Sequence, residues 1–169
     1  PTNDASAAFT VSSSDDHMAG DTTCDIDGGA VDCTGGTVSE GSHTFTATAT
    51  DTAGNSASAS YTWYTDLTDP TASLISGPGP DGLQSLYSRT DAAFTFTASD
   101  DYSLSHTECA WDSPVFGAGL GDECESGASM SGLTEGVHTF SVWAVDEAGN
   151  AGIADTHTWT IDLAELTFD

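Results

Sequence analysis

The sequence repeats itself, and this duplication constrains the fold more than any other feature. Glu40–Phe45 reads EGSHTF and returns as EGVHTF in Glu135–Phe140, 95 positions later (135 − 40). Asp51–Asn55 returns at the same spacing as Asp146–Asn150, and Ala8–Val11 has a counterpart 85 positions later. A duplicated unit of this size predicts two similar small domains in tandem and argues against an enzyme with a single site.

Strand patterns dominate both repeats. His43–Thr50 alternates phenylalanine and alanine with threonine, and Ala57–Trp63 continues the alternation after a Gly-Asn turn. Phe140–Ala144 and Ile153–Ile161 do the same in the second repeat. A period of two predicts half-buried strands, and each pair with its turn predicts a β-hairpin. Further strands are expected at Ala7–Ser12, at Ala92–Ala98 and on both sides of the turn Asp27–Gly29. The sequence therefore predicts an all-β chain of two tandem antiparallel β-sandwich domains.

The boundary between the domains is expected at Asp66–Pro70, which follows the last strand of the first repeat and ends in a proline. We predict domain 1 at residues 1–66 and domain 2 at residues 67–162. Domain 2 opens with the strand-like Pro70–Ser76, well ahead of Phe94. Domain 1 reaches the matching Phe9 after only eight residues. Domain 1 is therefore predicted to lack its first strand.

The C-terminal segment, residues 163–169, has strand character but no expected partner in its own domain. Its apolar residues are Leu163, Leu166 and Phe168. One interpretation is that it completes domain 1 of the next copy, either covalently in a longer array or by strand donation in a fibre. The partners would then be further copies of the chain, head to tail. The alternative is a plain linker.

The charge is extremely unbalanced. The chain has 27 acidic residues and one basic residue, Arg89, giving a formal net charge of −26. Nucleic acid is excluded as a partner because phosphate binding needs lysine and arginine. Membrane insertion is not expected, because the apolar runs are far too short to span a bilayer. Bound divalent cations or a high-salt (halophilic) environment would each relieve the repulsion, and acidity that serves only solubility is equally consistent.

The four cysteines occur as one pair in each repeat. Three pairings are open in principle, and the duplication favours the local ones, Cys24–Cys33 and Cys109–Cys124. Metal binding by these thiols is disfavoured because no CxxC spacing occurs. Disulfides indicate an oxidising compartment, so we expect a secreted protein or an extracellular cell-surface protein.

Acidic clusters are the candidate calcium sites, because calcium takes six to eight oxygen ligands. The hairpin turns contribute Asp51, Asn55, Asp146 and Asn150; two acidic pairs contribute Asp15, Asp16, Asp100 and Asp101; and the domain boundary contributes Asp66 and Asp69. The boundary pair is our preferred site because an ion there would stiffen two modules. The alternative is ordinary turn chemistry at the hairpins and solvated loops elsewhere.

Other residues point away from catalysis. His43 and His138 occupy equivalent strand starts, which favours a packing or hydrogen-bonding role. Trp143 is either an exposed contact or glycan platform, or part of the second face of a central strand. The sequence contains no G-x-S-x-G elbow, no HExxH and no phosphate-binding glycine loop. We therefore predict that the chain is not an enzyme.

These segments resemble the Ig-like repeats of large bacterial and archaeal surface proteins. Such repeats carry an E/D-G-x-H-T-F strand, a T-D-x-A-G-N turn and a closing Y-T-W-x-x-D strand. Here the corresponding segments are Glu40–Phe45, Thr50–Asn55 and Tyr61–Asp66, with Glu135–Phe140, Asp146–Asn150 and Thr158–Asp162 in the second repeat. Cys24–Gly29 matches a C-x-x-D-G-G subtype, from which Cys109–Asp112 departs.

The resemblance implies Ig-like folds and a stalk, spacer or adhesive role, with calcium bound at turns or domain junctions in some members. We therefore expect a non-catalytic structural or adhesive segment of an extracellular surface protein or filament, stiffened by divalent cations. The alternative is a carbohydrate- or ligand-binding accessory module of a secreted enzyme. A surface glycan or a cell receptor is a candidate partner under either interpretation.

Overall fold

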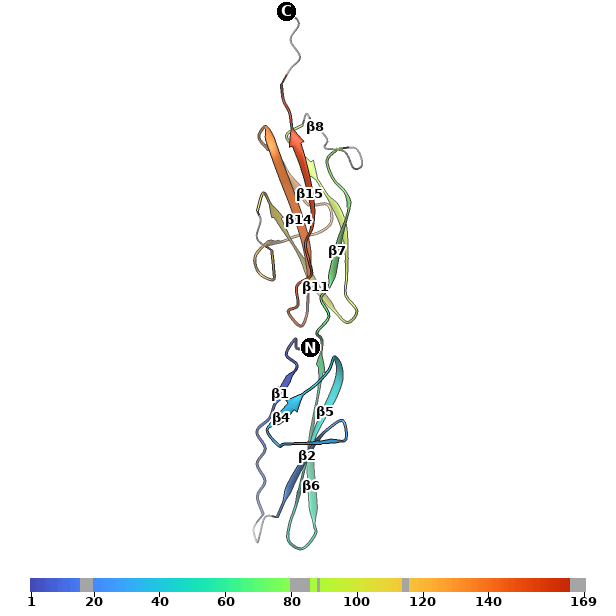
Figure 1. Ribbon diagram of the computed structural model, residues 1–169, viewed down its shortest axis with the longest axis vertical. Coiled ribbons are helices and arrows are strands. Elements are labelled where there is room, and N and C mark those ends of the chain that lie inside the picture. Colours follow the sequence, from blue (N-terminus) through green and yellow to red (C-terminus); the bar gives the residue numbers. More distant parts are fainter. Residues whose placement is uncertain (16–19, 80–85, 88, 114–115, 165–169) are drawn as a thin grey trace, which may run out of the picture. The chain divides into compact units, whose positions relative to one another are not determined.

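The computed structural model describes the chain except residues 16–19, 80–85, 88, 114–115 and 165–169. It divides into unit 1, Pro1–Leu67, and unit 2, Thr68–Asp169 (Figure 1). Every regular element of the described residues is a β-strand, which confirms the all-β prediction. Within that part of the chain, no apolar helix long enough to cross a membrane is found.

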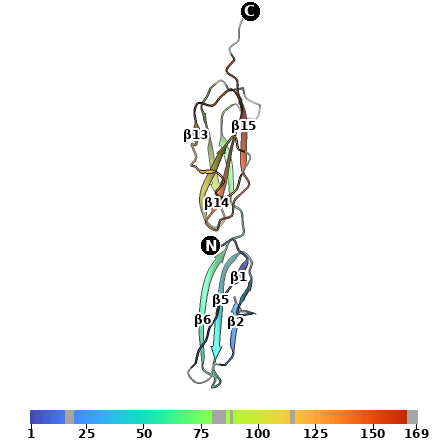
Figure 2. The same ribbon diagram turned by 90° about the vertical axis from the view of Figure 1, so that its left-hand side faces the viewer.

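Unit 1 is a small sandwich. Its larger layer is a four-stranded antiparallel sheet in the order β3-β2-β5-β6, and its smaller layer is the antiparallel pair β1-β4. Figure 2 shows β5 beside β6, the hairpin that the alternating pattern predicts. The strands are β1 (Ser6–Ala8), β2 (Thr22–Ile26), β3 (Gly29–Val31), β4 (Gly35–Thr37), β5 (Gly41–Thr50) and β6 (Ser56–Thr65).

The core of unit 1 is small. Cys24, Ile26 and Phe45 are its buried apolar residues, and they come from the alternating positions of β2 and β5. The Phe9 ring stacks on that of Phe45, with ring centroids 3.9 Å apart. Further apolar residues, including Trp63, are only partly buried against this cluster.

Unit 2 has a larger sheet in the order β12-β11-β14-β15-β8, faced by the antiparallel pairs β7-β10 and β9-β13. Its strands are β7 (Thr71–Ser76), β8 (Leu86–Tyr87), β9 (Ala92–Ala93), β10 (Thr95–Ser99), β11 (Leu104–Trp111), β12 (Asp122–Glu123), β13 (Ser129–Met130), β14 (Gly136–Asp146) and β15 (Asp155–Ile161). One pairing departs from the antiparallel prediction, because β8 runs parallel to β15. The chain enters the edge of the large sheet there before it crosses to β9 in the facing layer.

The core of unit 2 is much more extensive. Nine buried residues from both layers form one cluster: Ala92, Phe94, Phe96, Cys109, Leu133, Phe140, Val142, Trp159 and Ile161. Phe94 stacks on Phe140 at 4.2 Å between ring centroids, as Phe9 does on Phe45 in unit 1. The two units therefore share one core geometry.

The strand predicted at Ala92–Ala98 is interrupted. The Phe94 N–H donates to the Ala128 carbonyl, and the chain then leaves β13 and pairs with β7 through β10. In unit 1 the Phe9 N–H makes the matching bond to Thr34, but Thr10–Ser14 belongs to no strand. The predicted strand Ala7–Ser12 therefore ends at Ala8. No strand in the described part of unit 1 takes the place that β7 has in unit 2.

Two disulfides fasten these layers locally. Cys24 of β2 bonds Cys33 with 5.1 Å between the Cα atoms, and Cys109 of β11 bonds Cys124 with 5.9 Å. These are the pairings that the duplication favours, and they fit an oxidising compartment.

Candidate functional site

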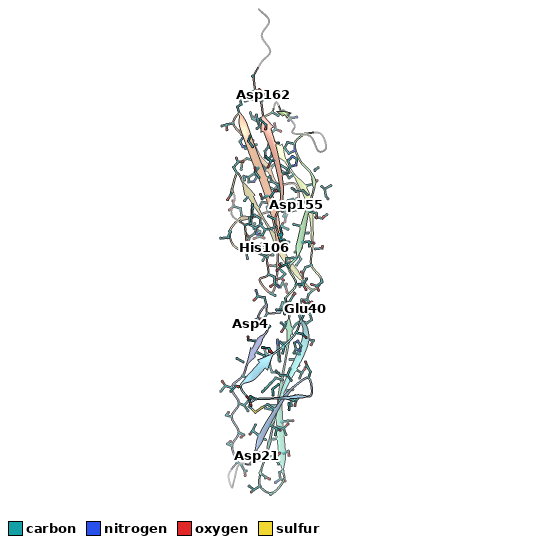
Figure 3. All side chains as sticks on the ribbon, in the orientation of Figure 1. Asp4, Asp21, Glu40, His106, Asp155 and Asp162 are labelled. Atoms are coloured by element: carbon teal, nitrogen blue, oxygen red, sulfur yellow. A yellow bond between two sulfur atoms is a disulfide. The ribbon has the colours of Figure 1, made fainter. Side chains whose placement is uncertain are left out.

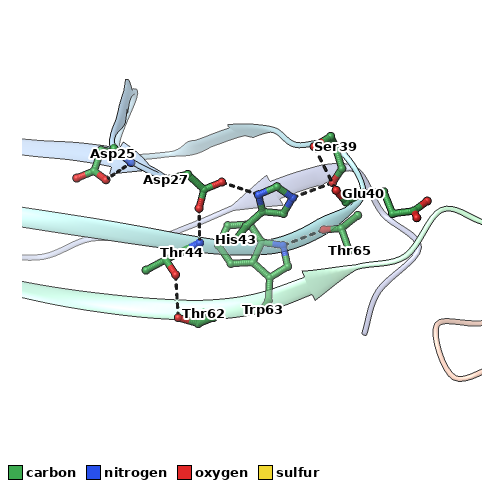
Figure 4. A network of polar contacts seen from close by, with 10 residues as sticks. Asp25, Asp27, Ser39, Glu40, His43, Thr44, Thr62, Trp63 and Thr65 are labelled. Atoms are coloured by element: carbon green, nitrogen blue, oxygen red, sulfur yellow. Dashed lines mark hydrogen bonds and ion pairs between the residues drawn. The ribbon is translucent and has the colours of Figure 1, made fainter. Parts of the chain in front are cut away.

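A buried histidine is the centre of the most regular polar cluster in each unit. In unit 1, His43 of β5 lies with Nδ1 2.7 Å from the Asp27 carboxylate and Nε2 2.8 Å from the Ser39 carbonyl oxygen (Figure 4). The second Asp27 oxygen accepts a hydrogen bond from the Thr44 N–H at 2.8 Å. The cluster therefore joins the β2–β3 turn to the start of β5.

Unit 2 repeats this cluster. His138 lies 2.8 Å from the Asp112 carboxylate and 2.8 Å from the Thr134 carbonyl, and the Thr139 N–H donates to Asp112 at 2.7 Å. Asp27 and Asp112 share a left-handed backbone, with φ of 53° and 51°. The hydrogen-bonding role expected for the histidines is thus observed. Sequence reasoning missed the aspartates, although each stands three residues after an equivalent cysteine.

The electrostatics of the cluster favour a charged histidine. Both ring nitrogens face oxygen acceptors, so only the doubly protonated imidazolium donates to both at once. The hydrogen bond that His43 donates to Asp27 raises the pKa of His43, against the opposing effect of burial. The hydrogen bond that His138 donates to Asp112 likewise raises the pKa of His138. In return, the His43 hydrogen bond lowers the pKa of Asp27. The pair in each unit acts as a structural clamp.

The repeated hairpin turns are built by their own aspartates. Asp51 Oδ1 accepts from the N–H groups of Ala53 and Asn55 at 2.8 Å each, and Oδ2 accepts from Asn55 Nδ2 at 2.6 Å. These bonds, with the Asn55 side chain foremost, lower the pKa of Asp51. Asp146 and Asn150 repeat the arrangement. Turn chemistry therefore accounts for these residue types without an ion.

The structure brings together acidic residues that the sequence left apart. In unit 1, Asp15 lines the same hollow, about 200 Å³, as Asp51 and Asn55. In unit 2, a carboxylate oxygen of Asp100 lies within 4.8 Å of one from Asp146. Asp15 and Asp100 are equivalent, being 85 positions apart. Each unit thus places the segment that follows its stacked phenylalanine, Phe9 or Phe94, beside the hairpin turn.

The Asp100–Asp146 pair is the better defined of the two. Asp100 Oδ2 accepts from the N–H groups of Tyr102 and Ser103 at 3.0 and 2.8 Å. Within the described structure, Asp100 Oδ1 is buried and makes no hydrogen bond. The sole basic residue of the chain, Arg89, binds Asp91 instead. Two carboxylates this close repel unless they are solvated or bridged, so the pair is the candidate cation position of unit 2.

The remaining acidic candidates differ in their exposure to solvent. Asp66 is buried in unit 1, and its N–H donates to the Thr2 carbonyl at 2.9 Å. Asp69, in unit 2, and Asp101 are exposed, and Asp16 lies outside the described residues. Figure 3 shows further acidic side chains spread over each unit, with Asp21 at one end of unit 1 and Glu40 at the other.

The tail residues predicted to contact another copy are only partly described. Leu163 is exposed, at 42% of its accessible surface. Leu166 and Phe168 lie outside the described residues.

The position of Trp143 decides between the two interpretations given above, an exposed platform and part of the second face of a central strand. It is fully buried, in a cluster with Ala110 and Val145 on the outer face of the large sheet of unit 2. Its indole N–H donates to the Gly117 carbonyl at 3.2 Å. An exposed contact or glycan platform at Trp143 is therefore wrong, because the glycine-rich connection between β11 and β12 covers the ring.

Glu108, which the sequence did not single out, holds that connection in place. It is buried in β11 and accepts from the N–H groups of Gly119 and Gly121 at 2.7 and 3.1 Å. Burial alone would raise its pKa, but these N–H groups and His106 lower it overall. No local sequence signal marks this residue, since its partners lie across a loop.

Unit 1 has an open groove on the inner face of β5 and β6, which we call the unit 1 groove. Two hollows form it, of about 390 and 270 Å³. Phe9, Tyr61 and Trp63 line the first, and Val11, Ala47 and Ala59 are among the residues lining the second. Tyr61 is 62% exposed there, although it belongs to an aromatic cluster with Phe9 and Trp63.

Comparison with known proteins does not identify a family for the chain. No family model matches the chain, and no curated protein is detectably similar to it in sequence. Among solved structures, the chain is similar to the fibronectin(III)-like modules of Clostridium thermocellum CbhA. The identity is 17% and the TM-score 0.48, over 94% of this chain and 87% of that one. The assignment as two tandem Ig-like sandwiches therefore stands on the strand pairing described above.

Proposed function

We propose that the chain is a non-catalytic structural or adhesive segment of an extracellular protein. One observation carries this proposal: the residues that recur between the units are used inside each unit. The histidine clamps, the aspartate turns and the disulfides all bind their own domain together. The duplicated residues therefore stabilise the fold of each unit. This is expected of a domain that is repeated to add length or spacing. The disulfides support a secreted or cell-surface location.

Divalent cations are proposed to stabilise these modules. In unit 2 the carboxylates of Asp100 and Asp146 would supply two oxygen ligands, and Asp15 with Asp51 would do so in unit 1. Calcium suits them because it accepts carboxylate, carbonyl and water oxygens in flexible geometry. A calcium site at the boundary aspartates Asp66 and Asp69 remains a prediction from the sequence.

A thermal melt of the purified chain tests the cation proposal. The protein is first melted in low salt with EDTA, then in millimolar calcium, and then in sodium chloride of matched ionic strength. Calcium at 100 times its Kd would stabilise the folded state by about 2.7 kcal/mol per site. We expect a higher melting temperature in calcium than in sodium.

Matched variants locate the effect. Asp100→Asn should remove most of the calcium response of unit 2 and leave its fold intact. Glu135→Gln removes one exposed charge from the same unit and should leave the response unchanged. Equal stabilisation by sodium and calcium would mean that the acidity is a general adaptation to salt, and the cation sites would be withdrawn.

A second candidate function is a carbohydrate-binding accessory module. The observation that favours it is the partly exposed aromatic cluster of Phe9, Tyr61 and Trp63 in the unit 1 groove. Aromatic faces are suitable platforms for sugar rings. Titration of soluble oligosaccharides, with Tyr61→Ala as the comparison, decides between the functions. Binding that Tyr61→Ala abolishes would favour this candidate.

A further inference from the structure

Unit 2 has an open hollow of about 330 Å³ between its two layers, which we call the β10 hollow. Phe96 and Ala98 of β10 line it from one layer, and Leu104 of β11 lines it from the other. The remaining lining residues are Ser105, His106, Thr107, Glu123, Cys124, Glu125 and Ser126. Neither the histidine clamp nor the candidate cation position uses any of these residues, so the hollow has no role in the sites described above.

The floor of the β10 hollow is apolar and is not fully covered. Phe96 belongs to the main core of unit 2, whereas Leu104 is 37% exposed and Ala98 is half-buried. Because Ala98 carries only a methyl group, room remains beside it for a side chain from another molecule. An apolar side chain placed there would bury the exposed surface of Leu104, which is favourable.

The backbone of β10 directs hydrogen-bonding groups toward the same hollow. One edge of β10 pairs with β7, and among the described residues no strand pairs with the other edge. The Phe96 N–H points to this second edge, because it donates to the Ser126 hydroxyl at 2.9 Å. Alternate N–H groups of a strand point to the same edge, so the Ala98 N–H also points there. An open edge of this kind is a template for an added strand.

Two acidic side chains lie at the rim of the hollow. Glu123 and Glu125 are both exposed, and they stand on either side of Cys124. The disulfide from Cys124 to Cys109 of β11 holds this segment in place. The β10 hollow therefore combines an apolar floor, an open strand edge and a negative rim, and each of these favours a different part of one ligand.

We propose that the β10 hollow binds an extended segment of a partner protein in which apolar residues alternate with lysine or arginine. The segment would pair with the open edge of β10 by β-augmentation, in which main-chain hydrogen bonds give affinity and pockets for alternate side chains give specificity. Its apolar side chains would enter the hollow against Ala98 and Leu104. Its basic side chains, which are long and flexible, would reach Glu123 and Glu125.

Charge complementarity favours a different protein as the partner over a second copy of this chain. The chain has 27 acidic residues and one basic residue, Arg89, which binds Asp91. A second copy would therefore bring like charge to the negative rim, and like charges across an interface oppose association. This inference rests on the proposed adhesive function and deepens it by naming the chemistry of the partner.

Binding of a synthetic peptide to the full chain tests the proposal. The probe is a short labelled peptide that alternates valine with lysine, and fluorescence anisotropy measures its Kd at physiological salt. The matched peptide has proline in place of every second valine, so it keeps the charge but cannot pair as a strand. Because it loses main-chain hydrogen bonds, we expect the matched peptide to bind about tenfold more weakly or worse.

Three variants locate the binding. Ala98→Met fills the hollow and should weaken binding of the alternating peptide about tenfold. Glu123→Gln/Glu125→Gln neutralises the rim and should weaken binding about threefold and reduce its dependence on salt. Glu135→Gln/Asp162→Asn removes the same number of charges at the opposite end of β14 from the hollow, and should leave the Kd unchanged.

The proposal is overturned if the proline peptide binds as tightly as the alternating peptide, because the attraction would then be a general effect of net charge. It is also overturned by a wild type that binds neither peptide, by a folded Ala98→Met that binds normally, or by equal effects of the rim and control variants. The two peptides and the exposed rim keep the test valid should Ala98→Met fail to fold. Each of these results would leave the calcium experiment, and with it the proposed structural function, unaffected.

Discussion

Unit 1 and unit 2 share a framework but differ in how they are covered. Each has a clamped histidine, an aspartate-built hairpin turn, a local disulfide and a stacked phenylalanine pair. In unit 2, β7 closes the inner face and a glycine-rich connection covers Trp143 on the outer face. Unit 1 has neither cover in its described residues. The duplicated residues thus specify the frame, while segments outside the duplication decide how much apolar surface is buried.

This difference has an energetic consequence. Burial of apolar surface is the main favourable contribution to folding, and small domains bury proportionally less of it. The described core of unit 1 has three buried residues, Cys24, Ile26 and Phe45, against the nine of unit 2. We therefore expect unit 1 to be the less stable unit, and more dependent on its disulfide and on any partner in its groove.

Truncating the stacked phenylalanines should show the largest effect. Phe140 is fully buried, so Phe140→Ala should cost unit 2 about 3–5 kcal/mol. Phe45→Ala should cost unit 1 less, because the groove beside Phe9 and Tyr61 is already open and less apolar surface is buried there. Differential scanning calorimetry that resolves one transition for each unit measures both losses. Equal losses would contradict the difference in coverage between the units.

Removing the disulfides should cause the next largest loss of stability. A disulfide closing a short loop contributes about 2–4 kcal/mol, and the loops here span 9 and 15 residues of sequence separation. Cys24→Ala/Cys33→Ala should unfold unit 1 near room temperature, because its core is small. Cys109→Ala/Cys124→Ala should leave unit 2 folded but less stable. Amide hydrogen exchange reports each unit separately, and a folded unit 1 without its disulfide would refute the expected dependence.

The histidine clamps should make a smaller contribution to the free energy of unfolding, and this contribution should change with pH in the same direction in both units. The pKa of His43 and of His138 is raised on folding above the ordinary value of about 6.5. Their contribution to stability is therefore fully present below about pH 6.5 and is lost as the pH rises through the folded pKa. For Asp27, whose pKa is lowered, the contribution is present above its ordinary pKa and is lost as the pH falls through the folded pKa.

Melting temperatures measured between pH 5 and pH 9 test this clamp. The wild type should lose stability as the pH rises above about 6.5, relative to His43→Gln and His138→Gln at the same pH. These variants keep the total acidity of the chain, so they also control for general charge repulsion. A difference between wild type and variants that grows with pH would disprove the assigned charge state.

Local patterns predicted much of this fold. The period-two alternation at His43–Thr50 and Ala57–Trp63 corresponds to the β5–β6 hairpin. The short strands β4, β12 and β13 were missed, because two or three residues containing glycine, serine or acidic side chains carry no periodic signal. The break at Phe94 was missed because it depends on a change of partner strand, which alternation within one segment does not reveal.

The sequence by itself determined the duplication, the hairpins, the local cysteine pairs and the residue types of the Asp51 and Asp146 turns. Each of these depends on residues close together in the chain or on the repeat itself. The tertiary structure decided that Asp27 clamps His43, that Asp100 lies beside Asp146, that Trp143 is buried and that the unit 1 groove is open. These features join segments far apart in sequence, and only the path of the folded chain brings such segments into contact.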